Sequence, residues 1–236
     1  MRATLKKWGI VFWEWLITGV AFGLGVLLVA ALFLGICASF ADAAQAQTVT
    51  IPRAAYQHRD TLIRASRAVW GLDAPVSIFA AQIHTESWWK NSTVSSAGAQ
   101  GLAQFMPSTA KWLPTVAPEV GAPAPFNPGW ALRALVSYDK WLWDRLHGAD
   151  ACQRMAFTLS AYNGGIGWVG RDRKEAERQG RDPARWFGQV EEVNAGRSAS
   201  SLRENRRYVR LILLERQYWY RKAGWGPGVG CGGGHD

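Results

Sequence analysis

Glu86 is the side chain whose setting most strongly points to chemistry. It ends a predicted short apolar helix that begins at Val76, and Phe79, Gln82 and Ile83 share its helical face. A carboxyl group on an apolar face loses hydration, which raises its pKa toward the range that a general acid needs at neutral pH. A glutamate at a frayed helix end that points into solvent is the alternative, and the spacing does not decide between the two.

A glycine-spaced loop follows this helix. Gly98 and Gly101 permit positive φ angles or a close backbone approach, so the stretch 95–104 is expected to fold as a tight turn. Pro107 and Ser108 then supply the start signal of a new helix. A compact loop that returns beside a helix-end carboxylate suits the wall of a cleft.

The segment resembles the signature of the soluble lytic transglycosylases, lysozyme-like enzymes that cleave peptidoglycan. Their pattern is a Glu-Ser pair followed by S-x-x-G-A-x-G-L-x-Q-x-M-P-x-T-A. The matching positions are Glu86, Ser87, Ser95, Gly98, Ala99, Gly101, Leu102, Gln104, Met106, Pro107, Thr109 and Ala110. AYNGG at 161–165 resembles the A-Y-N-x-G element of the family, and ENRRYV at 204–209 resembles its late E-T-x-x-Y-V element. Asn205 replaces the usual threonine, and Ala103 and Gly164 stand where methionine and alanine are common, which bears on substrate preference.

The resemblance implies a mainly α-helical domain of the lysozyme-like, goose-type architecture. It makes Glu86 the catalytic residue and implies a set of substrate-binding side chains, which are Ser95, Gln104, Met106, Tyr162 and Asn163. Tyr162 is expected near Glu86, where it orients the acetamido group of the sugar. Glu204 and Tyr208 are expected to support the site, although a surface glutamate or a structural ion pair explains Glu204 equally well. No metal ion or cofactor is implied.

The implied reaction uses a single carboxyl group. Asp73 precedes the helix and Glu119 lies in a proline-rich stretch, so no second acid accompanies Glu86 in the motif segment. Glu86 would protonate the glycosidic oxygen between N-acetylmuramic acid and N-acetylglucosamine, then act as a base while the muramic C6 hydroxyl closes a 1,6-anhydro ring. A hydrolytic muramidase, including a phage-type lysin, is one alternative. A non-catalytic protein that binds the wall or assists assembly is another.

Composition fits this interpretation. The 236 residues suffice for one catalytic domain and an appendage, with 48% hydrophobic and 19% charged residues. The net charge of +9 favours a polyanionic partner, and without a nucleic-acid motif the cell wall or a membrane is expected instead. The 14 tryptophans suit both sugar stacking and an aromatic core. Of Trp88 and Trp89, one is expected to face the core and the other is a candidate for stacking on a sugar.

The N-terminal residues predict export. Arg2, Lys6 and Lys7 precede an uncharged apolar run at 15–41, which is long enough to span a bilayer and would leave the N-terminus in the cytoplasm. The sequence does not decide between an anchor and a signal cleaved after Ala43 or Ala46. Either way, we expect the body in the periplasm or on the periplasmic face of the inner membrane. The contexts left open are a secretion or conjugation machine, a phage, and wall remodelling.

Three domains are therefore expected: a signal or transmembrane segment at 1–47, the catalytic domain at 48–223 and a glycine-rich tail at 224–236. Cys152 and Cys231 either pair as a disulfide or remain free thiols.

The body of the chain has helical periodicity and no alternating strand pattern, which predicts a mainly α-helical domain. Besides the helix at Glu86, the predicted helices are 55–70, 130–146, 155–162 and 202–220. The last of these is expected to bury Val209, Ile212 and Leu213. The proline-rich stretch 112–129 is read as a surface loop, with a place on the cleft rim as the alternative. The run 171–185 is read as solvated charge.

Overall fold

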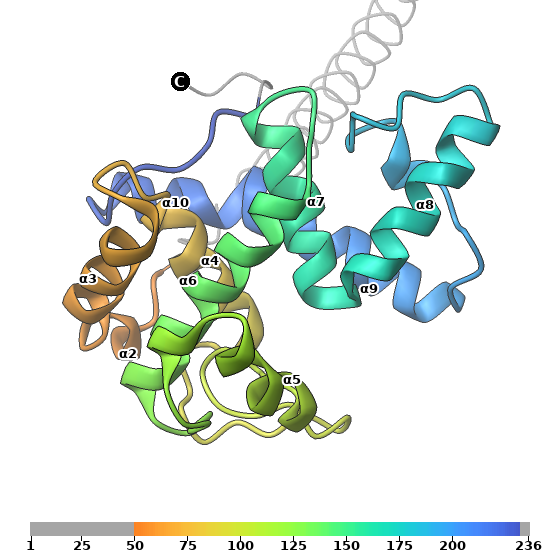
Figure 1. The fold of residues 1–236 in the computed structure, drawn as a ribbon. Coiled ribbons are helices and arrows are strands. Elements are labelled where there is room, and N and C mark those ends of the chain that lie inside the picture. Colours follow the sequence, from red (N-terminus) through yellow and green to blue (C-terminus); the bar gives the residue numbers. More distant parts are fainter. Residues whose placement is uncertain (1–49, 232–236) are drawn as a thin grey trace, which may run out of the picture. The chain divides into compact units, whose positions relative to one another are not determined.

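The computed structural model describes residues 50–231, and this part of the chain is mainly α-helical (Figure 1). The α-helices are α2 (Arg53–Tyr56), α3 (Arg59–Trp70), α4 (Val76–Ser87), α5 (Pro107–Trp112), α6 (Pro128–Arg145), α7 (Ala151–Gly164), α8 (Ile166–Arg178), α9 (Ala199–Arg210) and α10 (Gln217–Lys222). Short helical turns are η1 (Leu113–Thr115), η2 (Pro118–Val120) and η3 (Val190–Glu192), and η4 (Leu211–Arg216) is a π-helix. The expected N-terminal export segment at 1–47 lies outside the described residues. Within 50–231, none of the helices is long and apolar enough to cross a membrane.

The helix that ends beside Glu86 lies at the centre of the fold. Helix α4 contacts α3, η4 and α10 (Figure 1). Its residues Phe79 and Ile83 have no exposed surface. An α-helix that is apolar on most sides gains stability only where neighbours cover it all round, which explains this central place. Trp88 ends the helix in the left-handed conformation, with φ of 54°. The predicted helix is confirmed.

Capping residues set where α6 and α7 begin. The Asn127 side chain accepts a hydrogen bond from the Trp130 amide at 3.0 Å, and Asp150 accepts one from the Gln153 amide at 2.9 Å. These caps start each helix a few residues before the predicted boundary because they satisfy amide groups that have no partner within the helix. Helix α7 also runs on through Gly164, so its predicted end at residue 162 is too early.

The first and last predicted helices are each interrupted. The stretch 55–70 is divided between α2 and α3, and Gly71 ends α3 with a positive φ of 83°. The predicted helix at 202–220 is α9, η4 and α10 in succession, with the π-helical segment in the middle. Val209, Ile212 and Leu213 have no exposed surface, as predicted.

The charge run at 171–185 is not wholly solvated, which corrects the prediction. Helix α8 covers much of it, and its Asp172 is fully buried between Arg197 at 3.1 Å and Arg206 at 3.0 Å. Buried charges require such partners, because burial without them is costly. The two arginines follow 25 and 34 residues later in the chain, so no local sequence pattern predicts that they bind Asp172.

The proline-rich stretch 112–129 is also more than a surface loop. Leu113 and Val120 are buried, and the Pro125 carbonyl packs against Gly101 so closely that a Cβ there would lie 1.8 Å from its oxygen. The stretch therefore packs against the glycine-spaced loop, and only Gly fits at position 101.

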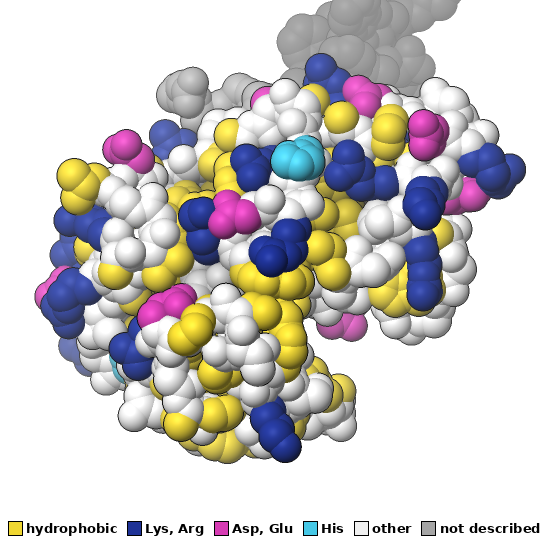
Figure 2. Space-filling view, in the orientation of Figure 1, with side chains coloured by type: hydrophobic (Ala, Val, Ile, Leu, Met, Phe, Trp, Pro, Cys, Tyr) yellow, Lys and Arg dark blue, Asp and Glu magenta, His cyan; other side chains and the backbone are white. Residues whose placement is uncertain are grey.

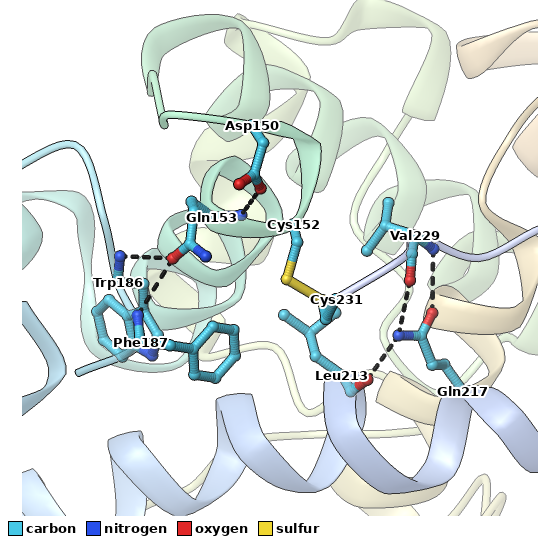
Figure 3. Close-up of a disulfide and its surroundings, with 9 residues drawn as sticks. All are labelled: Asp150, Cys152, Gln153, Trp186, Phe187, Leu213, Gln217, Val229 and Cys231. Carbon is cyan, nitrogen blue, oxygen red and sulfur yellow. Dashed lines mark hydrogen bonds between the residues drawn. A yellow bond between two sulfur atoms is a disulfide. The ribbon is translucent and has the colours of Figure 1, made fainter. Parts of the chain in front are cut away.

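A disulfide ties the C-terminal segment to α7. Cys152 and Cys231 are bonded, closing 79 residues of chain, and Figure 3 shows the bond beside Gln217. The Gln217 amide also pairs with the Val229 backbone through two hydrogen bonds of 3.1 Å (Figure 3). Of the two alternatives for these cysteines, the structure has the disulfide, and the glycine-rich segment is held in place as far as residue 231.

Candidate active site

A cleft of about 1000 Å³ opens at the C-terminal end of α4. Figure 2 shows the molecule hollowed between the lobe that carries α5 and the one that carries α9. All six site residues expected from the sequence line this cleft, namely Glu86, Ser95, Gln104, Met106, Tyr162 and Asn163. Other members of its lining are Trp88, Tyr138, Arg203, Glu204, Arg207, Tyr208 and Arg216. Residues spread over more than 100 positions of the chain thus meet around one carboxyl group.

Glu86 is half-buried, and its Oε1 accepts a hydrogen bond of 2.6 Å from the Tyr208 hydroxyl. Burial raises the pKa of Glu86 to about 8, the Tyr208 hydrogen bond opposes this rise, and the charge of Glu204 adds to it. A carboxyl group in this state is mostly protonated at neutral pH and holds a proton that it can donate. The solvent-pointing alternative does not describe this side chain.

Tyr162 joins the glycine-spaced loop to α7. Its hydroxyl donates a 2.8 Å hydrogen bond to the Ala103 carbonyl, and its ring packs near Phe105 and Tyr138. Burial, together with the nearby carboxyl groups of Glu86 and Asp139, raises the pKa of Tyr162 well above its usual value. Tyr162 is therefore a neutral hydroxyl that fixes the cleft wall beside Glu86.

The polar side chains of the loop mostly hold the loop itself. Ser95 Oγ accepts a 3.0 Å hydrogen bond from the Ala99 amide. Gln104 has a positive φ of 49°, and its Nε2 donates to the carbonyls of Thr93 and Gly101. These bonds stabilise the strained turn, which places the side chains at the edge of the cleft.

The two departures from the family pattern near α7 lie against each other. Asn205 is fully buried, and its Nδ2 donates to Asn163 Oδ1 and to the Ser160 carbonyl, both at 2.9 Å. A Cβ at Gly164 would lie 3.0 Å from Asn205 Nδ2 and 2.4 Å from Arg197 Nη1. Asparagine in place of threonine, together with Arg197, therefore occupies the space that an alanine at 164 would need.

Trp88 and Trp89 have opposite surroundings. Trp89 is 1% exposed and its indole donates a 2.7 Å hydrogen bond to Tyr220. Trp88 is 56% exposed on the cleft, with the Arg216 guanidinium 5.4 Å from its ring. The prediction that one of the pair faces the core is confirmed, and Trp88 is the one available to a ligand.

Two further carboxyl groups, both from outside the motif segment, lie near Glu86 in space. Glu204 lines the cleft, and Asp139, on α6, is fully buried close enough to raise the pKa of Glu86's neighbours Tyr162 and Tyr208. Both acids come from elements remote in sequence, so the motif segment does not contain them.

Asp139 forms a pair with Gln82. Gln82 Nε2 donates to Asp139 Oδ1 at 3.4 Å, while Asp139 Oδ2 and Gln82 Oε1 are buried without a partner among the described residues. Burial raises the pKa of Asp139 well above its usual value, and the nearby Glu86 adds to this. A protonated Oδ2 can donate to Gln82 Oε1 and satisfy both atoms. The sequence carried a signal for this residue, because Asp139 lies on the apolar face of α6, four residues after Leu135.

No group of three or more His, Cys, Asp and Glu side chains within residues 50–231 is arranged to hold a metal ion.

A family model places the chain among known proteins. The transglycosylase SLT domain model matches residues 65–184, a range that contains Glu86, the glycine-spaced loop and Tyr162. The chain therefore belongs to the transglycosylase SLT domain family, to which the sequence pattern had pointed.

Individual relatives are more distant. The chain is 29% identical over 148 residues to the membrane-bound lytic murein transglycosylase F of Shewanella halifaxensis, covering 62% of this chain and 26% of that protein. It is 33% identical over 110 residues to the protein of the same name from Maricaulis maris, covering 46% of this chain and 23% of that one. The chain thus spans about a quarter of the length of the curated relatives it matches.

A solved structure supports the fold. The 70-kDa soluble lytic transglycosylase in complex with bulgecin A superposes with a TM-score of 0.52 at 22% identity, covering 76% of this chain and 26% of that chain. The lysozyme-like helical architecture expected from the resemblance is supported at the level of the fold.

Proposed function

We propose that this protein is an exported lytic transglycosylase that cleaves the MurNAc-β-1,4-GlcNAc bond of peptidoglycan and leaves 1,6-anhydro-MurNAc ends. The observation that carries the proposal is Glu86, a carboxyl group with a pKa raised to about 8 at the base of a cleft of about 1000 Å³. Membership of the SLT domain family supports the same activity.

The first step is proton donation by Glu86. At neutral pH its carboxyl group is mostly protonated, and Tyr208 occupies Oε1 as a donor, so the acidic proton resides on Oε2. Donation to the glycosidic oxygen lets the bond to the muramic C1 break. The acetamido group of the substrate itself stabilises the positive charge that develops on the sugar.

The second step uses Glu86 as a base. The ionised carboxylate removes the proton of the muramic C6 hydroxyl, whose oxygen attacks C1 and closes the anhydro ring. The Tyr208 hydrogen bond stabilises the carboxylate between the two steps. Asp139 remains neutral in its pair with Gln82, so it supplies neither a nucleophile nor a base.

The cleft lining would hold the glycan strand. Trp88 is the exposed aromatic surface suited to stacking on a sugar ring, and Met106, 41% exposed, offers an apolar wall. Tyr162 and Asn163, at the end of α7, would orient the acetamido group beside Glu86, and Ser95 and Gln104 line the same cleft.

Three features support export. The Cys152–Cys231 disulfide is typical of an oxidising compartment. The named relatives are membrane-bound transglycosylases, and this chain has its own apolar segment at 15–41. We propose that the enzyme acts in the periplasm or on the periplasmic face of the inner membrane, where the contexts of a secretion or conjugation machine, a phage and wall remodelling all stay open.

A hydrolytic muramidase is the second candidate, and Glu204 is the observation that favours it. This glutamate lines the same cleft as Glu86, and two carboxyl groups are what most glycosidases use to activate water. The two functions differ in the product, since hydrolysis leaves reducing ends.

Glu86→Gln tests the catalytic role, with Glu177→Gln on the exposed side of α8 as its control. Loss of the proton donor should lower turnover of purified peptidoglycan by about 100-fold or more, while thermal unfolding remains cooperative. Unchanged turnover by Glu86→Gln would contradict the proposal. Wild-type binding to peptidoglycan without any turnover would favour the wall-binding alternative.

A further inference from the structure

Arg203 and Arg207 lie on α9 and line the Glu86 cleft. They lie one helical turn apart, and both are exposed. Within residues 50–231, neither guanidinium group forms an ion pair or a side-chain hydrogen bond. The other two arginines of this stretch are occupied, because Arg206 binds Asp172 and Arg210 binds Glu191.

The unpaired arginines separate two hollows. Beside the Glu86 cleft is a smaller hollow of about 470 Å³ on the outer side of α9. Arg203, Arg207 and Leu211 line both hollows. The two guanidinium groups therefore form a basic wall that leads outward from the cleft.

The charge balance of the cleft is positive. Its lining contains Arg203, Arg207 and Arg216, against Glu204 and the mostly neutral Glu86. Arg216 donates to Thr85 Oγ1 at 2.9 Å. Burial lowers the pKa of Arg216, Tyr220 and Glu215 oppose this, and the charge of Arg207 adds to the lowering. These cations face a common space, and an anion bound there would relieve their repulsion.

We propose that Arg203 and Arg207 bind free carboxylates of the peptide stem that hangs from the muramic acid, so that the enzyme prefers peptide-bearing strands to stripped ones. This proposal rests on the proposed function. The sugar rings and their acetamido groups carry no charge, and the anionic groups of a glycan strand lie in the peptides attached to the lactyl groups. Arginine suits this ligand because its planar guanidinium pairs with a carboxylate through two hydrogen bonds.

The test compares two substrates with one pair of variants. The substrates are uncross-linked glycan strands that carry stem peptides, and the same strands after an amidase has removed the peptides and the lactyl carboxylates freed by that hydrolysis have been converted to neutral amides. The variants are the double substitution Arg203→Gln and Arg207→Gln, and the control Arg64→Gln and Arg67→Gln on α3, which removes two exposed charges outside both hollows.

We expect the Arg203/Arg207 pair variant to raise KM for peptide-bearing strands by about tenfold, with kcat and the KM for stripped strands changed less than about twofold. The control pair should leave both substrates unchanged. Equal effects of the Arg203/Arg207 change on both strands, or no effect on either, would overturn the proposal.

A binding measurement separates this proposal from the proposed function. Calorimetric titration of Glu86→Gln with the two strands, with and without the arginine substitutions, requires no chemistry. Tighter binding of peptide-bearing strands that disappears with the arginines supports the carboxylate site even if wild-type turnover is absent. Equal affinity for both strands rejects the site even if the enzyme is an active transglycosylase.

Discussion

Tyr208 and Glu86 lie 122 residues apart in the chain, and the hydroxyl of the first donates a 2.6 Å hydrogen bond to the carboxyl group of the second. Tyr208 is 6% exposed, and burial is the main cause that raises its pKa well above the usual value. It is therefore a permanent donor at physiological pH. The bond joins the centre of the fold to α9 and favours the charged form of Glu86, which lowers a pKa that burial raises.

Tyr208→Phe should consequently raise the pKa of Glu86 above 8. We expect kcat near pH 7 to fall about tenfold, because the carboxylate formed after proton donation loses its stabilising partner. The alkaline limb of the pH–rate profile, near pH 8 in the wild-type enzyme, should move to higher pH. Tyr218→Phe, outside the cleft lining, serves as the control. A limb that stays in place or moves to lower pH would show that the bond does not tune the acid.

Glu86 should also make folding stability depend on pH. Its pKa is about 8 in the folded chain and near 4.5 when unfolded, so the folded state holds the extra proton between these values. The contribution of Glu86 to stability is therefore greatest below about pH 4.5, declines as pH rises and is lost above about 8, a change of the order of a few kcal/mol. Glu86→Gln should remove this part of the decline. Urea unfolding of both proteins at pH 5, 7 and 9 measures the difference, and parallel curves would count against the raised pKa.

Asp139→Asn should change stability and turnover very little. A neutral carboxylic acid paired with Gln82 is well replaced by an amide, so we expect a stability change within about 1 kcal/mol and turnover close to wild type. Asp139→Ala removes the partner and should cost about 1–3 kcal/mol, because the Gln82 amide is left buried and unpaired. Both values come from denaturant titration. Abolished turnover in Asp139→Asn would instead mean that an ionised Asp139 takes part in the reaction.

Helices and motifs could be predicted from the sequence because their signals are local. The apolar face of α4, Pro107 at the start of α5 and the amphipathic stretch that contains Val209 depend on neighbours within one or two turns. The burial of Asp172 could not be predicted, because its partners Arg197 and Arg206 lie in a different part of the chain. The starts of α6 and α7 are set by the capping side chains of Asn127 and Asp150, so the apolar pattern alone predicts these helices too short.

In the candidate site, too, local motifs could be predicted from the sequence and contacts between remote parts of the chain could not. Its members gathered around Glu86 as the family pattern implied, but Asp139 and Glu204 enter through tertiary contacts with α6 and α9. Asp139 has a local signal all the same, because it is an acid on an apolar helical face, the feature that also marks Glu86. Whether Arg203 has an ion-pair partner, by contrast, depends on which acids the fold brings near it, and no local sequence pattern shows that.

Gly164→Ala should destabilise the protein by about 1–3 kcal/mol. The added methyl group would meet Arg197 and Asn205, and both are held by buried partners. Combining it with Asn205→Thr should recover part of the loss, since threonine is shorter. Thermal unfolding of the single and double variants gives the coupling between the two positions. Additive effects would mean that Arg197 alone opposes the methyl group.

Reduction of the Cys152–Cys231 bond should loosen the C-terminal segment. A disulfide that closes a loop of this length typically contributes about 2–4 kcal/mol, so a reducing agent should lower the melting temperature measurably. The double variant Cys152→Ser and Cys231→Ser should melt at the lower temperature and be insensitive to the reducing agent. Equal melting temperatures with and without the reducing agent for the wild-type chain would contradict the contribution assigned to the bond.

The central claim is that one carboxyl group, Glu86, acts first as acid and then as base on a glycan strand. Mass spectrometry of the muropeptides released from purified peptidoglycan tests it most directly. The account predicts products that end in 1,6-anhydro-MurNAc, made by the wild-type chain and lost with Glu86→Gln. Products with reducing ends, dependent on both Glu86 and Glu204, would contradict it and identify a hydrolase.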